Sequence, residues 1–110
     1  MEQISQAVAQ WIENGGPLRN DITNPDVARE IGIFGNQLTA WMTASGYESF
    51  KQWITKLRIE EAKRVIEANP DWSNETIADH CGFTRSSFYR IFKSETGMTP
   101  AQYQEQQGEG

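Results

Sequence analysis

The sequence has one cysteine and one histidine, Cys81 and His80, and they are neighbours. A single cysteine excludes a disulfide framework, and this pair cannot supply the ligands of a usual zinc site, so we expect no metal and no cofactor. A catalytic pair of this kind would also need a third, orienting group and a cleft, and the sequence indicates neither. We therefore expect Cys81 to be a buried apolar residue and the protein not to be an enzyme.

Long apolar runs are also missing, so no segment is long enough to span a membrane, and the first residues are not typical of a signal peptide. We expect a cytoplasmic protein. Basic residues are fewer than acidic ones, 10 against 15, which gives a net charge of −5. This balance counts against nucleic-acid binding, which basic surface drives, unless the basic residues are concentrated locally.

The residues that are present favour an all-α fold of about seven helices. Apolar residues recur at helical spacing, and glycine, proline and capping residues stand between these stretches, while sustained strand alternation is missing. We expect a polar loop before Thr23, Asn24 as the cap of the second helix, and a frayed tail over 107–110. The expected helices cover about 2–14, 24–31, 36–45, 48–68, 74–81 and 85–96, with a last one from Pro100 after a Thr99–Gln102 capping box.

One pattern of residues occurs twice with no insertion between the copies. The matched pairs, 50 positions apart, are Val27/Ile77, Ala28/Ala78, Ile31/Cys81, Gly32/Gly82, Ile33/Phe83, Leu38/Phe88, Trp41/Ile91 and Met42/Phe92. Each copy predicts a helix, a turn that contains glycine, and a second helix docked by apolar residues. This is the layout of a helix-turn-helix unit, whose second helix enters the major groove of DNA. The alternative is a pair of helical hairpins with no DNA role.

The longest predicted helix carries two apolar stripes. Phe50, Trp53, Ile54 and Leu57 lie on one face, and Ile59, Ala62, Val65 and Ile66 lie roughly 140° around the helix. We therefore expect it to join two subdomains, 1–46 and 70–106, as a linker over 47–69. A helix of this length spans about 30 Å, close to one turn of B-DNA, so one chain could place two recognition helices in successive major grooves.

The second recognition helix has a basic outward face. Residues 83–94 contain three basic residues and no acidic one. We expect Arg85, near the helix start, to contact guanine, and Arg90 and Lys93 to hold phosphate. Ser86 and Tyr89 are positioned to reach bases or sugar.

The first recognition helix carries no charge on its outward face. Asn36 or Gln37 could read adenine through the side-chain amide, and Ala40 could touch a thymine methyl group. Thr39 and Thr43 complete this face. The alternative, that the face contacts DNA weakly or not at all, stays open.

Two stretches of the sequence form a longer pattern. They are Arg58-Ile59-Glu60-Glu61-Ala62-Lys63 and the residues from Ile77-Ala78 through Gly82-Phe83 and Phe88–Lys93 to Gly97-Met98-Thr99-Pro100 and Tyr103. Both stretches resemble the DNA-binding domain of the AraC/XylS family of bacterial transcription regulators. The resemblance covers about residues 25–104. It implies seven helices, two homeodomain-like helix-turn-helix subdomains and binding to promoter DNA through Asn36, Thr39, Ala40, Arg85, Ser86 and Tyr89.

The resemblance also bears on partners. Family members usually carry a separate sensing or dimerisation region, so we expect this domain to work with such a region of a larger parent protein, which could be membrane-tethered. We expect no small-molecule site within these residues. The main alternative function is a helical protein-interaction module on a degenerate helix-turn-helix scaffold, favoured by the acidic net charge.

Overall fold

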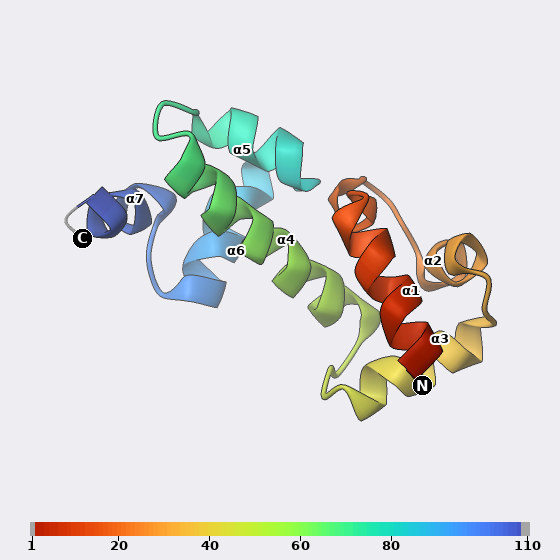
Figure 1. Cartoon of the computed structure of the whole chain (residues 1–110). Helices are drawn as coiled ribbons and strands as arrows, with labels where there is room; N and C mark the ends of the chain where they lie inside the picture. Colours follow the sequence, from red (N-terminus) through yellow and green to blue (C-terminus); the bar gives the residue numbers. More distant parts are fainter. Residues whose placement is uncertain (1, 109–110) are drawn as a thin grey trace. The chain divides into compact units, whose positions relative to one another are not determined.

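The computed structural model describes residues 2–108, which form seven α-helices, one short 3₁₀ turn and no strand (Figure 1). The predicted all-α class is confirmed. No helix within these residues is both long enough and apolar enough to cross a membrane. The elements are α1 (Glu2–Glu13), η1 (Gly16–Leu18), α2 (Asn24–Ile31), α3 (Gly35–Ala44), α4 (Phe50–Ala68), α5 (Asn74–Cys81), α6 (Arg85–Thr96) and α7 (Pro100–Gly108).

The chain divides into two compact units, Met1–Thr55 and Lys56–Gly110. The boundary lies within α4, whose first turns belong to unit 1 and whose remaining turns belong to unit 2. This boundary lies inside the linker predicted over 47–69. Trp53 and Ile54 of the first stripe are buried in unit 1, and the residues of the second stripe are buried in unit 2.

Trp53 of α4 lies at the centre of the core of unit 1. Its side chain is 1% exposed, and its ring centroid is 5.7 Å from that of Trp11 and 5.5 Å from that of Trp41. Trp41, one of the apolar residues predicted to dock the second helix, is only half-buried, and its indole nitrogen donates a hydrogen bond to the Ser5 hydroxyl at 2.9 Å. The buried apolar residues of this unit are Val8, Trp11, Val27, Ala28, Leu38, Met42, Trp53 and Ile54.

The second stripe of α4 is buried in unit 2, as predicted. It packs against α5 and α6, and Tyr103 of α7 closes the core with its ring 5.8 Å from that of Phe92. The buried residues of this core are Ile59, Ala62, Val65, Ile66, Ile77, Ala78, Cys81, Phe83, Phe88 and Phe92.

A polar cluster ties α5 to α4. Glu61 accepts two hydrogen bonds from Arg64, at 2.8 and 2.7 Å, and one from His80 of α5 at 2.7 Å. The hydrogen bond from Arg64, followed by that from His80, lowers the pKa of the Glu61 carboxyl despite its partial burial. Glu61 is thus an anchor between two helices rather than part of a solvated face.

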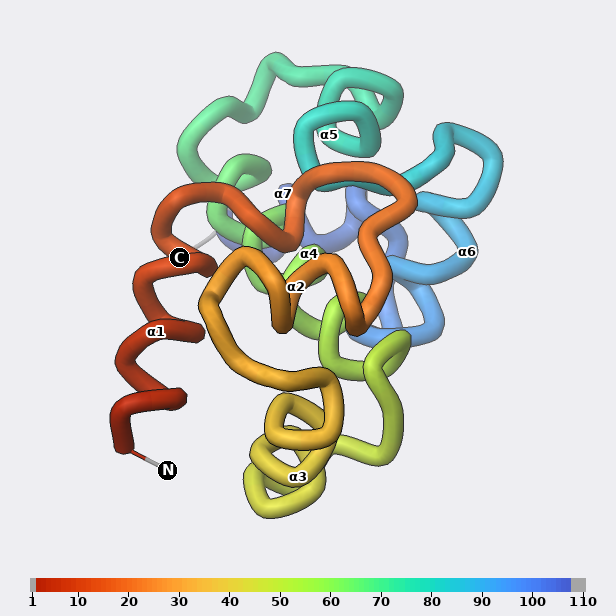
Figure 2. Tube along the Cα trace, turned by 90° about the vertical axis from the view of Figure 1, so that its right-hand side faces the viewer, coloured from red at the N-terminus to blue at the C-terminus, as the bar shows by residue number. Residues whose placement is uncertain are grey.

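The repeat seen in the sequence is reproduced in the backbone of the two turns. Gly32 and Gly82 adopt φ of 81° and 85°, the left-handed conformation that glycine tolerates best. The next amide in each copy, of Ile33 or Phe83, donates to the carbonyl of the alanine five residues earlier, at 2.9 and 3.0 Å. This is the Schellman pattern of a helix end, and it turns α2 toward α3 and α5 toward α6 (Figure 2).

The cap of α2 differs from the prediction. Thr23, not Asn24, is the N-cap, because its hydroxyl accepts from the amide of Asp26 and its own amide donates to the Asp26 carboxylate. The Asn24 side chain is used elsewhere and donates to the Thr39 hydroxyl at 3.1 Å.

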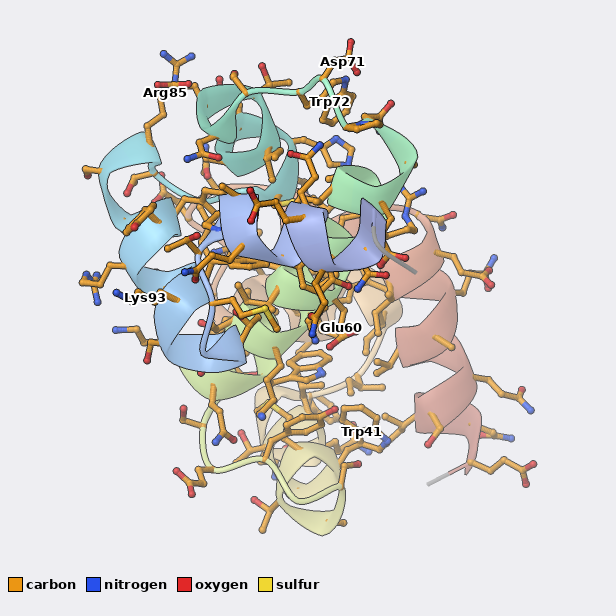
Figure 3. The ribbon with its side chains drawn as sticks, turned by 90° about the vertical axis from the view of Figure 1, so that its left-hand side faces the viewer. Trp41, Glu60, Asp71, Trp72, Arg85 and Lys93 are labelled. Carbon is orange, nitrogen blue, oxygen red and sulfur yellow. The ribbon has the colours of Figure 1, made fainter. Side chains whose placement is uncertain are left out.

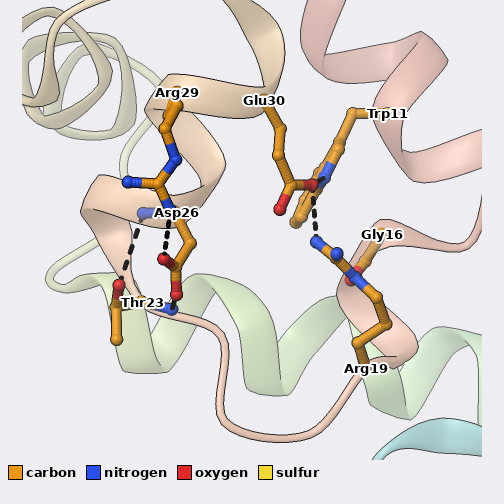
Figure 4. A network of polar contacts seen from close by, with 7 residues as sticks. All are labelled: Trp11, Gly16, Arg19, Thr23, Asp26, Arg29 and Glu30. Carbon is orange, nitrogen blue, oxygen red and sulfur yellow. Dashed lines mark hydrogen bonds and ion pairs between the residues drawn. The ribbon is translucent and has the colours of Figure 1, made fainter.

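The predicted polar loop before Thr23 contains the turn η1. Gly16 and Pro17 are buried there, and Trp11 covers Gly16 (Figure 4). The Trp11 indole nitrogen donates to Glu30 at 3.1 Å, and Arg19 pairs with the same carboxylate oxygen at 2.5 Å. These contacts fix the loop to α2.

The tail predicted to fray over 107–110 is helical as far as Gly108, and residues 109–110 lie outside the described part of the chain. Two contacts hold α7 to the rest of unit 2. The Tyr103 hydroxyl donates to Glu67 at 2.8 Å, and the Gln104 amide donates to the Pro70 carbonyl. The predicted Thr99–Gln102 capping box that starts α7 is confirmed.

Replacing Gly16 by alanine is expected to destabilise unit 1. A Cβ atom at this position would lie 2.1 Å from Cε2 of Trp11, so the indole would have to move and its bond to Glu30 would break. We expect a loss of about 1–3 kcal/mol in the free energy of unfolding, measured by urea titration with tryptophan fluorescence. Gly35→Ala is the matched control, because a Cβ there meets no atom within 4 Å, and equal destabilisation by both variants would contradict the explanation.

Cys81 is expected to be unreactive in the folded protein. It is 0% exposed, and its burial, together with the Glu61 charge, raises the pKa of the thiol from 9.0 to about 12. An aromatic disulfide reagent at mildly alkaline pH should therefore modify the thiol only after unfolding in guanidinium chloride. Rapid modification of the folded protein, followed by absorbance, would show that the thiol is accessible.

Candidate nucleic-acid interface

The outward face of α6 carries all five residues predicted for it. Arg85 and Lys93 project away from the ribbon of α6 in Figure 3. The opposite face of the helix is anchored in the core by Phe88 and Phe92, which are 1% and 0% exposed. The exposed residues are Arg85, Ser86, Tyr89, Arg90 and Lys93.

The cations of this face differ in their partners. Among residues 2–108, no acidic side chain is paired with Arg90 or Lys93. Arg85 is paired with Asp79 of α5. The face therefore combines two cations suited to phosphate with one arginine that is already engaged.

The pair between Arg85 and Asp79 is bidentate. Nε of Arg85 donates to Oδ1 of Asp79 at 3.2 Å, and Nη2 donates to Oδ2 at 2.7 Å. The hydrogen bond from Arg85 lowers the pKa of the Asp79 carboxyl, and the same bond raises the pKa of the guanidinium. Both groups are therefore ionised at neutral pH. Because both side chains are more than half exposed, the pair contributes little to folding stability.

The outward face of α3 carries the residues predicted for unit 1 and no charge. Asn36, Gln37, Thr39, Ala40 and Thr43 are all exposed. The two basic residues that precede α3 in the sequence are both in ion pairs. Arg29 of α2 pairs with Asp26, and Arg19, directly after η1, pairs with Glu30 (Figure 4). Contacts from this face must rely on hydrogen bonds and apolar surface.

Two of the polar side chains on α3 are used within the unit. Oε1 of Gln37 accepts from the amide of Phe34 at 2.8 Å, which caps the helix start and folds the side chain back along it. The Thr39 hydroxyl accepts from Asn24 and donates to the Gly35 carbonyl at 3.1 Å. A bidentate contact between Gln37 and adenine would thus require the cap to be released, whereas Asn36 has no such role.

The structure draws attention to two residues that the sequence analysis missed. Phe34, at the N-cap position of α3, is 76% exposed, although it is apolar. The repeat could have indicated this exposure, because the residue that matches Phe34 in the second copy is the polar Thr84. Asp79 gave no such signal, since it meets Arg85 only after the chain turns at Gly82.

The described residues contain no group of three or more His, Cys, Asp or Glu side chains that could hold a metal ion. Cys81 is buried with a raised pKa, which opposes formation of a thiolate. His80 is engaged with Glu61.

Comparison with known proteins agrees with this geometry. A family model described as a helix-turn-helix domain matches residues 27–106. The chain is 28% identical over 106 residues to the transcriptional regulator YijO of Escherichia coli, covering 96% of the chain and 36% of YijO. It is 35% identical over 63 residues to the transcriptional regulatory protein YesN of Bacillus subtilis, covering 56% of the chain and 17% of YesN. The chain thus spans only about a sixth to a third of these relatives.

Solved structures show the same fold. A DNA-binding transcriptional dual regulator from Escherichia coli superposes with a TM-score of 0.78 at 26% identity, over 94% of this chain and 91% of that one. The DNA-binding domain of AdpA, solved with a target DNA, has a TM-score of 0.75 at 22% identity, over 92% and 88% of the two chains. The protein belongs to the AraC-type helix-turn-helix family, the DNA-binding domains of transcription regulators.

Proposed function

We propose that the protein binds promoter DNA sequence-specifically, with α3 and α6 as recognition helices in successive major grooves of one duplex. The observation that carries the proposal is the basic, exposed face of α6 on the second helix of a helix-turn-helix unit. Local concentration of cations on this face outweighs the acidic net charge, because a short-range electrostatic contact depends on the nearest charges.

Within α6, residues near the helix start read bases and later residues hold the backbone. Arg85 at the first position of the helix contacts guanine through its guanidinium, and Ser86 and Tyr89 contact bases or sugar. Arg90 and Lys93, further along the helix, hold phosphates.

Within α3, recognition is uncharged. Asn36 reads adenine through its amide, and Ala40 and the exposed Phe34 offer apolar surface to thymine methyl groups or sugar. Gln37 supports this end of the helix as a cap, while Thr39 and Thr43 line the contact with their methyl groups. Specificity from this helix therefore comes with little salt-dependent affinity.

A second partner is a sensing or dimerisation region of a larger regulator. Support for this partner comes from the relatives, which are much longer than the part that this chain matches. In this proposal the domain acts on promoter DNA in the cytoplasm, has no catalytic activity and binds no small molecule itself.

A different function, a helical module that binds another protein, is favoured by the net charge of −5 and by the exposed Phe34 on an uncharged helix. The double variant Arg85→Ala/Arg90→Ala separates the two functions. We expect it to lose DNA binding, measured by fluorescence anisotropy at low salt, while circular dichroism shows the fold intact. Undiminished DNA binding would remove the α6 face from the interface.

Lys93→Ala is expected to weaken binding to all duplexes alike, because a phosphate contact carries no sequence information. The slope of log K against log salt should fall by about 1. Lys63→Ala is the matched control in the same unit: Lys63 of α4 pairs with Glu60 and lines a hollow formed by α4 residues and Tyr103 of α7. An equal fall in the slope for Lys63→Ala would contradict a phosphate contact specific to α6, since loss of any cation would then have the same effect.

A further inference from the structure

Arg85 presents only part of its guanidinium to an incoming base. A guanidinium has five N–H donors, and its side-on edge, formed by Nε and Nη2, is occupied by the Asp79 carboxylate. The end-on edge, formed by Nη1 and the second hydrogen of Nη2, adjoins the side-on edge and carries no bond to that carboxylate. Two donors at this edge match the paired acceptors N7 and O6 of guanine.

We propose that Asp79 is the positioning residue that makes Arg85 a guanine reader, a step that rests on the proposed function. The carboxylate holds the guanidinium by two bonds, so that Arg85 offers its end-on edge in one orientation. An arginine without this support samples many rotamers and can turn to the nearest phosphate. Asp79 therefore lowers the affinity for duplexes of any sequence and increases the discrimination between bases.

The charge of Asp79 acts in the same direction. A carboxylate beside the recognition helix repels phosphate, and it does so for every duplex, whatever its sequence. Only a base that can accept two bonds from the oriented arginine compensates for this repulsion. The pair is more than half exposed in the free protein, and burial against DNA would strengthen it.

Another acidic residue of α5 separates charge from positioning. The charge of Glu75, in the first turn of α5, also raises the pKa of the Arg85 guanidinium. That guanidinium, however, donates its hydrogen bonds to Asp79 and not to Glu75. A change at Glu75 removes the same charge from the same helix and leaves the guanidinium held. Glu75→Ala is therefore the matched control for Asp79→Ala.

The experiment measures affinity for three duplexes by fluorescence anisotropy. The first is a duplex that the unaltered protein enriches from a random pool. The second is the same duplex with one guanine replaced by 7-deazaguanine, at the position where Arg85→Ala no longer discriminates between bases. The third is a scrambled duplex. We expect Asp79→Ala to bind the scrambled duplex more tightly and to lose about tenfold of its preference for guanine over 7-deazaguanine. Asp79→Asn, which keeps an oxygen acceptor, should retain part of the preference. Glu75→Ala should bind all three duplexes more tightly and keep the whole preference.

Equal changes in affinity for all three duplexes in Asp79→Ala would overturn the inference, since Asp79 would then only repel DNA. A stronger preference for guanine would also overturn it, since the carboxylate would then obstruct Arg85. In both cases the unaltered protein still selects a sequence, so the proposed function stands. If the unaltered protein enriches no duplex, the proposed function and this inference fail together.

Discussion

Both recognition faces depend on the turn inside each helix-turn-helix, between α2 and α3 and between α5 and α6. In both turns the first helix ends at a glycine with a positive φ, Gly32 or Gly82, which turns the chain within three residues. The close packing of Ala28 and Ala78 then fixes the second helix against the first. Because α3 and α6 follow directly, the outward direction of every candidate contact residue is set by these turns.

The two units use this scaffold with different chemistry. In unit 2, α6 carries cations, and two carboxylates of α4 and α5 are engaged in local contacts, Glu61 with His80 and Asp79 with Arg85. In unit 1, α3 is uncharged, and its polar side chains partly serve the helix itself. In the proposed function, α6 therefore supplies the salt-dependent affinity and also reads guanine, whereas α3 adds only uncharged contacts.

The sequence predicted the helices, the repeat and the outward faces, because each of these depends on local spacing. The matched pair Leu38 and Phe88 is buried in both copies, and the predicted contact residues on α3 and α6 are all exposed. Local spacing could not show where polar side chains find partners. Thr23 as the cap of α2, the packing of Gly16 under Trp11 and the hold of Asp79 on Arg85 all depend on contacts formed after the chain turns.

Selection of bound duplexes from a random DNA pool at low salt tests most directly whether both units read sequence. We predict two short motifs with centres about one helical turn apart, one contacted by each recognition helix. The motif of α6 should contain the guanine read by Arg85. A single motif would contradict the role given to α3, and no enrichment at all would contradict sequence-specific binding by this domain.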